Sequence, residues 1–196
     1  MKIAAPLLST ITTVLLAVTP AAQAQENIDL GQGYLCCNML ASGTWISDQN
    51  YRGDTSKVMI PFGTPLRHAG WGRSRMQVDI EGRRLEIGND YSRNLSMEEF
   101  GRRYLVQKDP RKQPAYTGAS AKVQKMIETA RVTRGMTRAQ VIISLGYPTA
   151  NDNPVLEATP WKYAAYNGPF SVHFDAKGLV TNVHADPETL KQVYTP

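Results

Sequence analysis

Cys36 and Cys37 are the only cysteines of this 196-residue chain and its only candidates for thiol chemistry. In an oxidising compartment such a pair forms a vicinal disulfide, stays as two free thiols, or links to another molecule. Neighbouring Cα atoms lie about 3.8 Å apart across a trans peptide, below the usual disulfide range, so the spacing favours two buried thiols. A redox-active or metal-binding pair is disfavoured because the chain has no C-x-x-C motif and no histidine close to the pair.

The three histidines, His68, His173 and His184, are the remaining candidates for acid–base or metal chemistry. Each lies on a segment predicted to be a strand or a strand edge. There, an imidazole that is hydrogen-bonded within the protein or exposed to solvent is favoured over a catalytic or metal-binding one. The sequence contains no G-x-S-x-G, H-E-x-x-H, P-loop or G-x-G-x-x-G motif. We therefore expect no enzymatic activity, no cofactor and no metal site.

Positive charge is concentrated in the middle of the chain. Residues 52 to 138 carry 18 Lys and Arg against 9 Asp and Glu, a balance of +9. The densest basic run lies between residues 102 and 112. It could bind anionic phospholipid headgroups, lipopolysaccharide or an acidic protein. The competing interpretation is a helix end whose charges are simply solvated. A nucleic-acid partner is not expected for an exported chain. The candidate interaction residues are this run and two aromatic residues further along the chain: Arg102, Arg103, Lys108, Arg111, Lys112, Tyr147 and Trp161.

The N-terminus has the pattern of a secretory signal peptide. Lys2 precedes an apolar run at residues 11 to 18, and Ala22-Gln23-Ala24 supplies the small residues of a cleavage site. The apolar run is too short and too interrupted to span a bilayer. We expect cleavage after Ala24 and a soluble periplasmic or secreted protein with no transmembrane segment.

Short alternating strands are predicted between residues 57 and 93, with a hairpin turn at Glu81-Gly82. Such tight spacing predicts a small curled barrel, and residues 25 to 95 resemble a Src-homology-3-like module. A capping box formed by Ser96 and Glu99 then begins a helix that ends before Asp109-Pro110. Residues 96 to 118 are thus a basic helix and a linker.

In the last part of the chain, residues 119 to 196, the sequence pattern predicts a pair of helices followed by strands. Residues 121 to 132 carry apolar side chains at helical spacing, and Thr137 with Gln140 forms a capping box for a helix over residues 138 to 145, which Gly146 and Pro148 end. Alternating strands follow around Trp161, at residues 170 to 174 and at residues 179 to 184. The predicted fold class is α+β, with a small N-terminal β-barrel-like module followed by a helix hairpin packed on a three-stranded antiparallel sheet.

This last part resembles the BamE-like domain, also called the small protein A or outer-membrane lipoprotein A domain. The resemblance is carried by residues in the second helix and the strands: Gly135, Met136, Thr137, Val141, Leu145, Gly146, Pro148, Trp161, Tyr163, Phe174, Gly178 and Asn182. It implies a non-catalytic domain that binds protein partners during outer-membrane assembly. The chain departs from the family at position 25, where a glutamine stands in place of the lipid-bearing cysteine.

Three functions remain open at the level of the sequence. The resemblance favours a periplasmic protein-interaction role in cell-envelope or outer-membrane protein assembly and maintenance, with barrel-assembly components as possible partners. A soluble inhibitor of an exported enzyme is the alternative, since similar domains occur in β-lactamase inhibitory proteins. Binding of the cell wall or of an anionic lipid surface through the basic barrel is the third.

Overall fold

The computed structural model of this chain describes residues 28 to 196. The predicted signal peptide, residues 1 to 24, and its cleavage site lie outside the described residues. Between residues 28 and 196, no helix has the length and apolar character needed to cross a bilayer.

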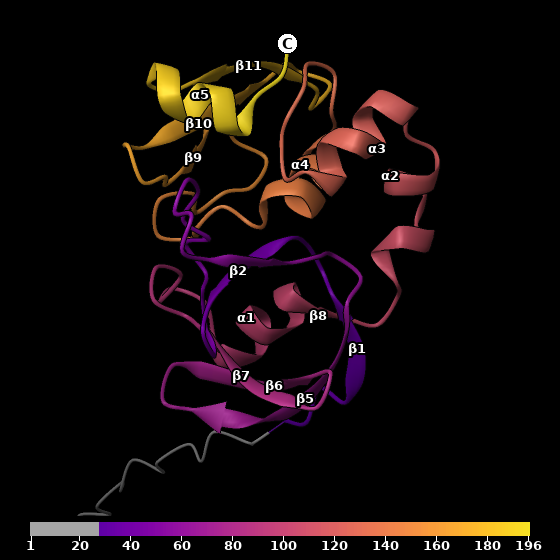
Figure 1. Cartoon of the computed structure of the whole chain (residues 1–196), viewed down its shortest axis with the longest axis vertical. Helices are drawn as coiled ribbons and strands as arrows, with labels where there is room; N and C mark the ends of the chain where they lie inside the picture. The colour runs from indigo at the N-terminus through magenta and orange to yellow at the C-terminus, as the bar shows by residue number, and fades with distance from the viewer. Residues whose placement is uncertain (1–27) are drawn as a thin grey trace, which may run out of the picture.

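An eight-stranded sheet forms the larger part of the molecule and curls into a ring (Figure 1). Its strand order is β4-β2-β3-β7-β6-β5-β1-β8, and every neighbouring pair is antiparallel except β3 with β7. The strands are β1 Gln32–Leu35, β2 Met39–Ser42, β3 Trp45–Ser47, β4 Val58–Ile60, β5 Pro65–Gly72, β6 Arg75–Ile80, β7 Arg83–Gly88 and β8 Leu105–Val106. The sheet therefore has one concave face, which must be filled by apolar side chains.

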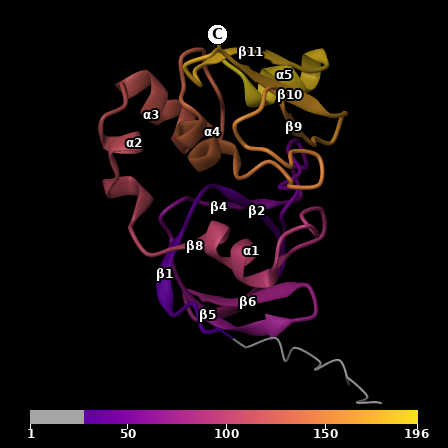
Figure 2. The same ribbon diagram turned by 180° about the vertical axis from the view of Figure 1, so that it is seen from behind.

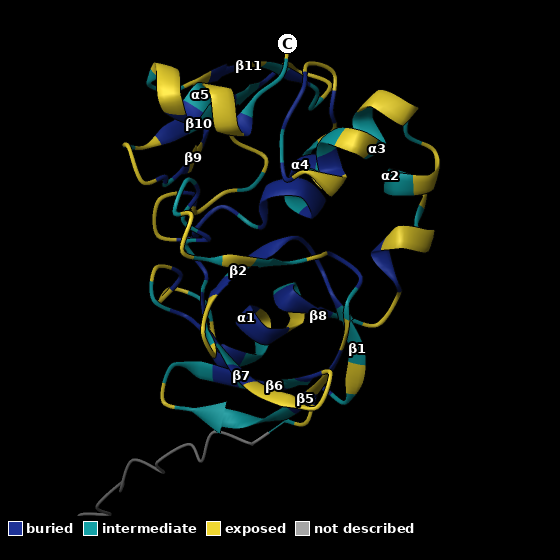
Figure 3. Ribbon diagram, in the orientation of Figure 1, coloured by how far each residue is buried: buried dark blue, intermediate teal, exposed yellow. Residues whose placement is uncertain are grey.

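Helix α1, Met97–Tyr104, fills the inside of this ring. It begins at the predicted capping box, in which Ser96 accepts from the amide of Glu99 and the Glu99 carboxylate accepts from the amide of Ser96. Phe100 and Tyr104 are almost fully buried, and Figure 3 shows the helix within the strands, dark blue on its buried positions and yellow where it is exposed. The helix approaches the sheet closely at Gly101, where an added Cβ would lie 2.5 Å from the Trp71 ring.

The chain then leaves the ring through short helical segments and builds a second, three-stranded sheet of order β11-β10-β9. Helix α4 begins at the second predicted capping box, where Thr137 and Gln140 bond to each other's backbone amides. The elements are the 3-10 turn Pro110–Lys112, α2 Pro114–Thr117, α3 Ala121–Glu128, α4 Arg138–Leu145, β9 Trp161–Tyr163, β10 Phe170–Phe174, β11 Val180–His184 and α5 Pro187–Val193.

Each sheet has its own apolar cluster. The first cluster lies inside the curled sheet around α1, and the second joins α3, α4 and α5 to the buried residues of β9, β10 and β11. Figure 2 shows the two parts from behind, with the curled sheet at one end and the three-stranded sheet at the other. Residues along β10 alternate, with Phe170, Val172 and Phe174 buried and Ser171 and His173 only half-buried. The three-stranded sheet thus has one apolar face and one polar face.

The predicted fold class is wrong. Over residues 28 to 196 the chain is mixed α+β, but an eight-stranded curled sheet dominates it. A three-stranded sheet and five α-helices complete this part, so it is not a helix hairpin on a three-stranded sheet. The capping boxes located the starts of α1 and α4 correctly because a capping box depends on residues three positions apart. They carried no information on what the helices pack against.

Two further features of the fold were missed at the level of the sequence. Strands β1, β2 and β3 were not predicted, and β3 pairs in parallel with β7, about forty residues later, with Ile46 opposite Ile87. Helix α5, which begins at the Asp186 cap and Pro187, was also not predicted.

Candidate functional site

The two parts of the molecule meet at a polar seam formed by Asn38, Asn50 and Arg52. The Asn38 amide nitrogen donates to the carbonyl oxygens of Ile127 (2.6 Å) and Ser144 (3.2 Å), and its side-chain oxygen accepts from the amide of Phe62 (3.0 Å). Asn38 is 0% exposed. Its amide nitrogen therefore ties the curled sheet to α3 and to the end of α4, and its oxygen is satisfied by the backbone of Phe62.

Asn50 extends the seam from the loop after β3. Its side-chain oxygen accepts from the amide of Leu40 (2.8 Å), and its amide nitrogen donates to the carbonyls of Asn38 (2.8 Å) and Leu145 (2.7 Å). The residue has a φ of 47°, a left-handed conformation that asparagine adopts more readily than most residues. Asparagine therefore suits position 50 both through its backbone conformation and through its side-chain hydrogen bonds.

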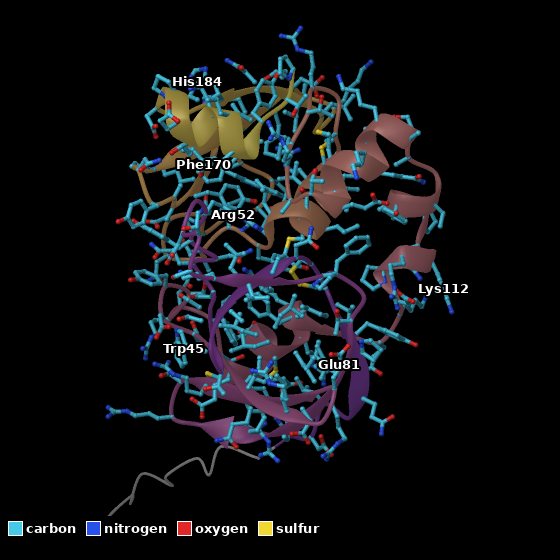
Figure 4. The ribbon with its side chains drawn as sticks, in the orientation of Figure 1. Trp45, Arg52, Glu81, Lys112, Phe170 and His184 are labelled. Carbon is cyan, nitrogen blue, oxygen red and sulfur yellow. A yellow bond between two sulfur atoms is a disulfide. The ribbon has the colours of Figure 1, made fainter. Side chains whose placement is uncertain are left out.

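Arg52 is the third member of the seam, and Figure 4 labels it between the curled sheet and the C-terminal elements. One terminal nitrogen donates to the carbonyl oxygens of Leu145 (2.9 Å), Asn38 (3.3 Å) and Ser144 (3.4 Å). Burial lowers the pKa of the guanidinium to about 10, so it remains charged at neutral pH. Among residues 28 to 196 it has no carboxylate partner, and the carbonyls at the C-terminal end of α4 supply the compensating negative charge.

A groove of about 280 Å³ opens at the same junction, beside the seam. Cys36 and Val106 contribute from the curled sheet, Ala139, Ile142 and Ile143 from α4, and Tyr147 from the segment after α4. Lys108, Pro110 and Gln113 close it along the linker. Its surface is mostly apolar, with the exposed Lys108 as its charged member.

Tyr147 connects the groove to the basic run. Its ring lies 5.2 Å from the Arg103 guanidinium and 6.2 Å from the Tyr104 ring. Burial raises the pKa of Tyr147, and the nearby Arg103 partly opposes that rise. The phenol is therefore neutral at physiological pH and offers the groove an aromatic edge with one hydrogen-bonding group.

Cys36, which lines the groove, forms a disulfide with Cys37. The favoured prediction of two free thiols is wrong, although the two residues are buried as expected, at 5% and 0% exposed. Formation of the bond depends on how the loop after β1 folds, which the spacing alone does not determine. The disulfide makes this wall of the groove apolar, and no thiol remains there.

The structure brings together three of the predicted interaction residues, Arg103, Lys108 and Tyr147. Arg102 instead pairs with Glu98 (2.8 Å), and Arg111 pairs with Asp109 (2.9 Å). Lys112 is exposed outside the groove.

Trp161 lies in the core. It is 1% exposed, its indole nitrogen donates to the carbonyl of Leu156 (2.9 Å), and its ring packs against Phe174. It is therefore unavailable as a surface contact, which removes it from the candidate site.

Sequence reasoning missed Asn38, Asn50, Arg52 and the contribution of Cys36 to the groove. The side-chain partners of Asn38 and Arg52 in α4 lie up to 106 positions away, so no short motif could identify them. In the part of the chain that the structure describes, no three or more His, Cys, Asp or Glu side chains gather at one point that could hold a metal.

Searches against protein-family models, curated proteins and solved structures found no match to this chain.

Proposed function

We propose that this chain is an exported, non-catalytic binding protein of the cell envelope that holds a short segment of a partner protein in the groove. The observation that carries the proposal is the combination of an apolar groove with a basic rim at a junction that the seam holds fixed. Apolar walls favour insertion of an apolar side chain, and Lys108 and Arg103 favour acidic residues beside it.

The size of the groove favours a peptide segment over a larger ligand. Small-molecule sites usually enclose about 300 to 1,000 Å³. The groove, at about 280 Å³, lies just below that range and suits one or two apolar side chains of a protein. Because the seam bonds are internal to the protein, the groove is preformed, and binding requires little ordering of its walls.

The envelope setting rests on the signal-peptide pattern of residues 1 to 24 and on the resemblance of the C-terminal part to BamE-like domains. These two features make assembly or maintenance of outer-membrane proteins the favoured role. The two other functions, inhibition of an exported hydrolase and binding of an anionic surface, predict different partners for the same groove. Identification of the partner therefore decides among the three functions.

The test uses capture from envelope extract with paired variants. Ala139→Trp fills the groove from an exposed position on α4, and Lys108→Glu reverses the charge of its rim. Lys125→Trp on α3 and Lys112→Glu on the linker are the matched controls, because both residues are exposed and outside the groove. We expect the first pair to lose the partner and the controls to retain it.

The captured species then separates the functions. Barrel-assembly components support the proposal, a single hydrolase supports the inhibitor role, and retention on anionic vesicles without any protein supports lipid binding. Because the rim is charged, the partner should bind more weakly as salt increases, with screening over about 8 Å at physiological ionic strength. Equal capture by all five proteins, wild type included, would contradict a role for the groove.

A further inference from the structure

Two of the three histidines of the chain meet on the polar face of the three-stranded sheet. His173 lies on β10 and His184 on the neighbouring β11, and the register places Ser171 opposite His184 and His173 opposite Asn182. The two histidines are therefore diagonal neighbours on one face, with ring centres 4.3 Å apart. Figure 4 labels His184 at the end of the molecule that lies away from the curled sheet.

Neither imidazole is engaged by a carboxylate in the described part of the chain. The only histidine ion pair between residues 28 and 196 joins His68 to Asp29, at 3.0 Å. His184 is exposed and His173 is half-buried. Among the described residues, the one polar contact of their rings is between Ser171 Oγ and His173 Nε2, at 3.1 Å. Both rings thus keep nitrogens free for a ligand from solvent.

The separation of the rings matches that of two imidazoles on one metal ion. A metal bound at about 2.0 to 2.1 Å from one nitrogen of each ring lies about 3.2 Å from each ring centre. If the two metal–nitrogen bonds make a right angle, the ring centres are about 4.5 Å apart, and if they make a tetrahedral angle, about 5.2 Å apart. The observed 4.3 Å is closest to the right angle. Rotation about the soft terminal torsion of each side chain then directs a nitrogen to the shared ion.

We propose that His173 and His184 form a two-imidazole site for a divalent transition metal, with Cu²⁺ preferred over Ni²⁺ and Zn²⁺. Tetragonal ions accept two neighbouring nitrogen ligands at a right angle, and copper binds nitrogen ligands most tightly in the first-row series. Water completes the coordination, because no third His, Cys, Asp or Glu joins the pair within the described residues. Ser171 acts as an outer partner that orients the His173 ring.

The sequence predicted no metal site, and this proposal departs from that prediction. His173 and His184 are eleven positions apart and fit no metal-binding motif. They become neighbours only through the pairing of β10 with β11. The proposal is independent of the groove, whose lining contains neither histidine.

The test is a titration of the protein, prepared without a histidine tag, with CuCl₂, NiCl₂ and ZnCl₂. We expect saturable binding of one metal ion per chain, tightest for Cu²⁺. Histidine-selective NMR should show Cu²⁺ broadening the His173 and His184 signals while that of His68, held by Asp29, stays sharp. Because the chain has only three histidines, each signal can be assigned by substitution.

His173→Gln and His184→Gln should each weaken binding by about tenfold or more, since each removes one of two ligands. Lys162→Gln, an exposed position on the same face opposite Ser171, is the matched control and should bind as the wild type does. Circular dichroism and the unchanged His68 signal would show that each variant is folded. The absence of saturable binding, equal broadening of all three histidines, or full affinity in either glutamine variant would overturn the proposal.

Discussion

The seam and the groove lie at the same junction but are built from opposite chemistry. The seam consists of buried polar side chains whose bonds are made within the molecule, from Asn38, Asn50 and Arg52 to the carbonyls at the end of α4. The groove consists of apolar side chains and a cationic rim with no intramolecular occupant among the described residues. The seam therefore determines how the two parts are held, and the groove remains available to a partner. Changes to the seam should alter stability, and changes to the groove should alter binding.

The largest expected effect is that of Arg52→Ala at the seam. The change leaves the buried carbonyls of Asn38, Ser144 and Leu145 short of a charged donor, so we expect a loss of about 3 kcal/mol in the free energy of unfolding. Urea denaturation measures it. Arg102→Ala is the control, because the exposed Arg102–Glu98 pair should contribute less than about 1 kcal/mol. Equal midpoints for the two variants would show that the seam does not stabilise the junction.

The next effect concerns the core beside the seam. Val141 of α4 is 0% exposed, and Val141→Ala should cost about 1 to 3 kcal/mol by leaving a cavity in the second apolar cluster. Denaturant midpoints measure this loss. The comparison is Ala139→Gly, on the exposed face of the same helix, which changes helix propensity without emptying the core. A Val141 variant no less stable than the Ala139 variant would mean that α4 does not depend on its packing.

A smaller effect is expected at the start of the same helix. Thr137→Ala removes the acceptor for the Gln140 amide and should cost about 1 kcal/mol. Ser120→Ala, at the cap of α3, is the comparison. Its hydroxyl accepts over 3.4 Å and belongs to no capping box, so the loss should be smaller. Thermal unfolding of both variants measures the difference, and the reverse order would contradict the role assigned to the capping box.

The smallest effect on stability is expected in the groove itself. Ala139→Trp adds a large side chain to an exposed position, so its unfolding free energy should change by less than about 0.5 kcal/mol. The same variant should nevertheless lose the partner captured by the wild type. A large loss of stability in Ala139→Trp would mean that the groove is a structural contact and would remove the contrast with the seam.

The sequence by itself determined features that depend on neighbouring residues. The capping boxes at Ser96 and Thr137 fixed the starts of α1 and α4, because donor and acceptor are three positions apart. The Glu81-Gly82 turn fixed the hairpin of β6 and β7, since both residues take positive φ, at 51° and 76°. In each case the local chain geometry decides the structure.

Only the tertiary structure decided which distant segments meet. The bonds from Asn38 and Arg52 to α4, the parallel pairing of β3 with β7 and the meeting of His173 with His184 all depend on strand order and packing. Alternating apolar residues predict a strand but not its neighbour, because any strand of matching pattern could pair with it. The candidate site was only partly predictable for the same reason: charge and aromatic character pointed to Lys108 and Tyr147, whereas the walls that make them a groove come from segments about one hundred residues apart.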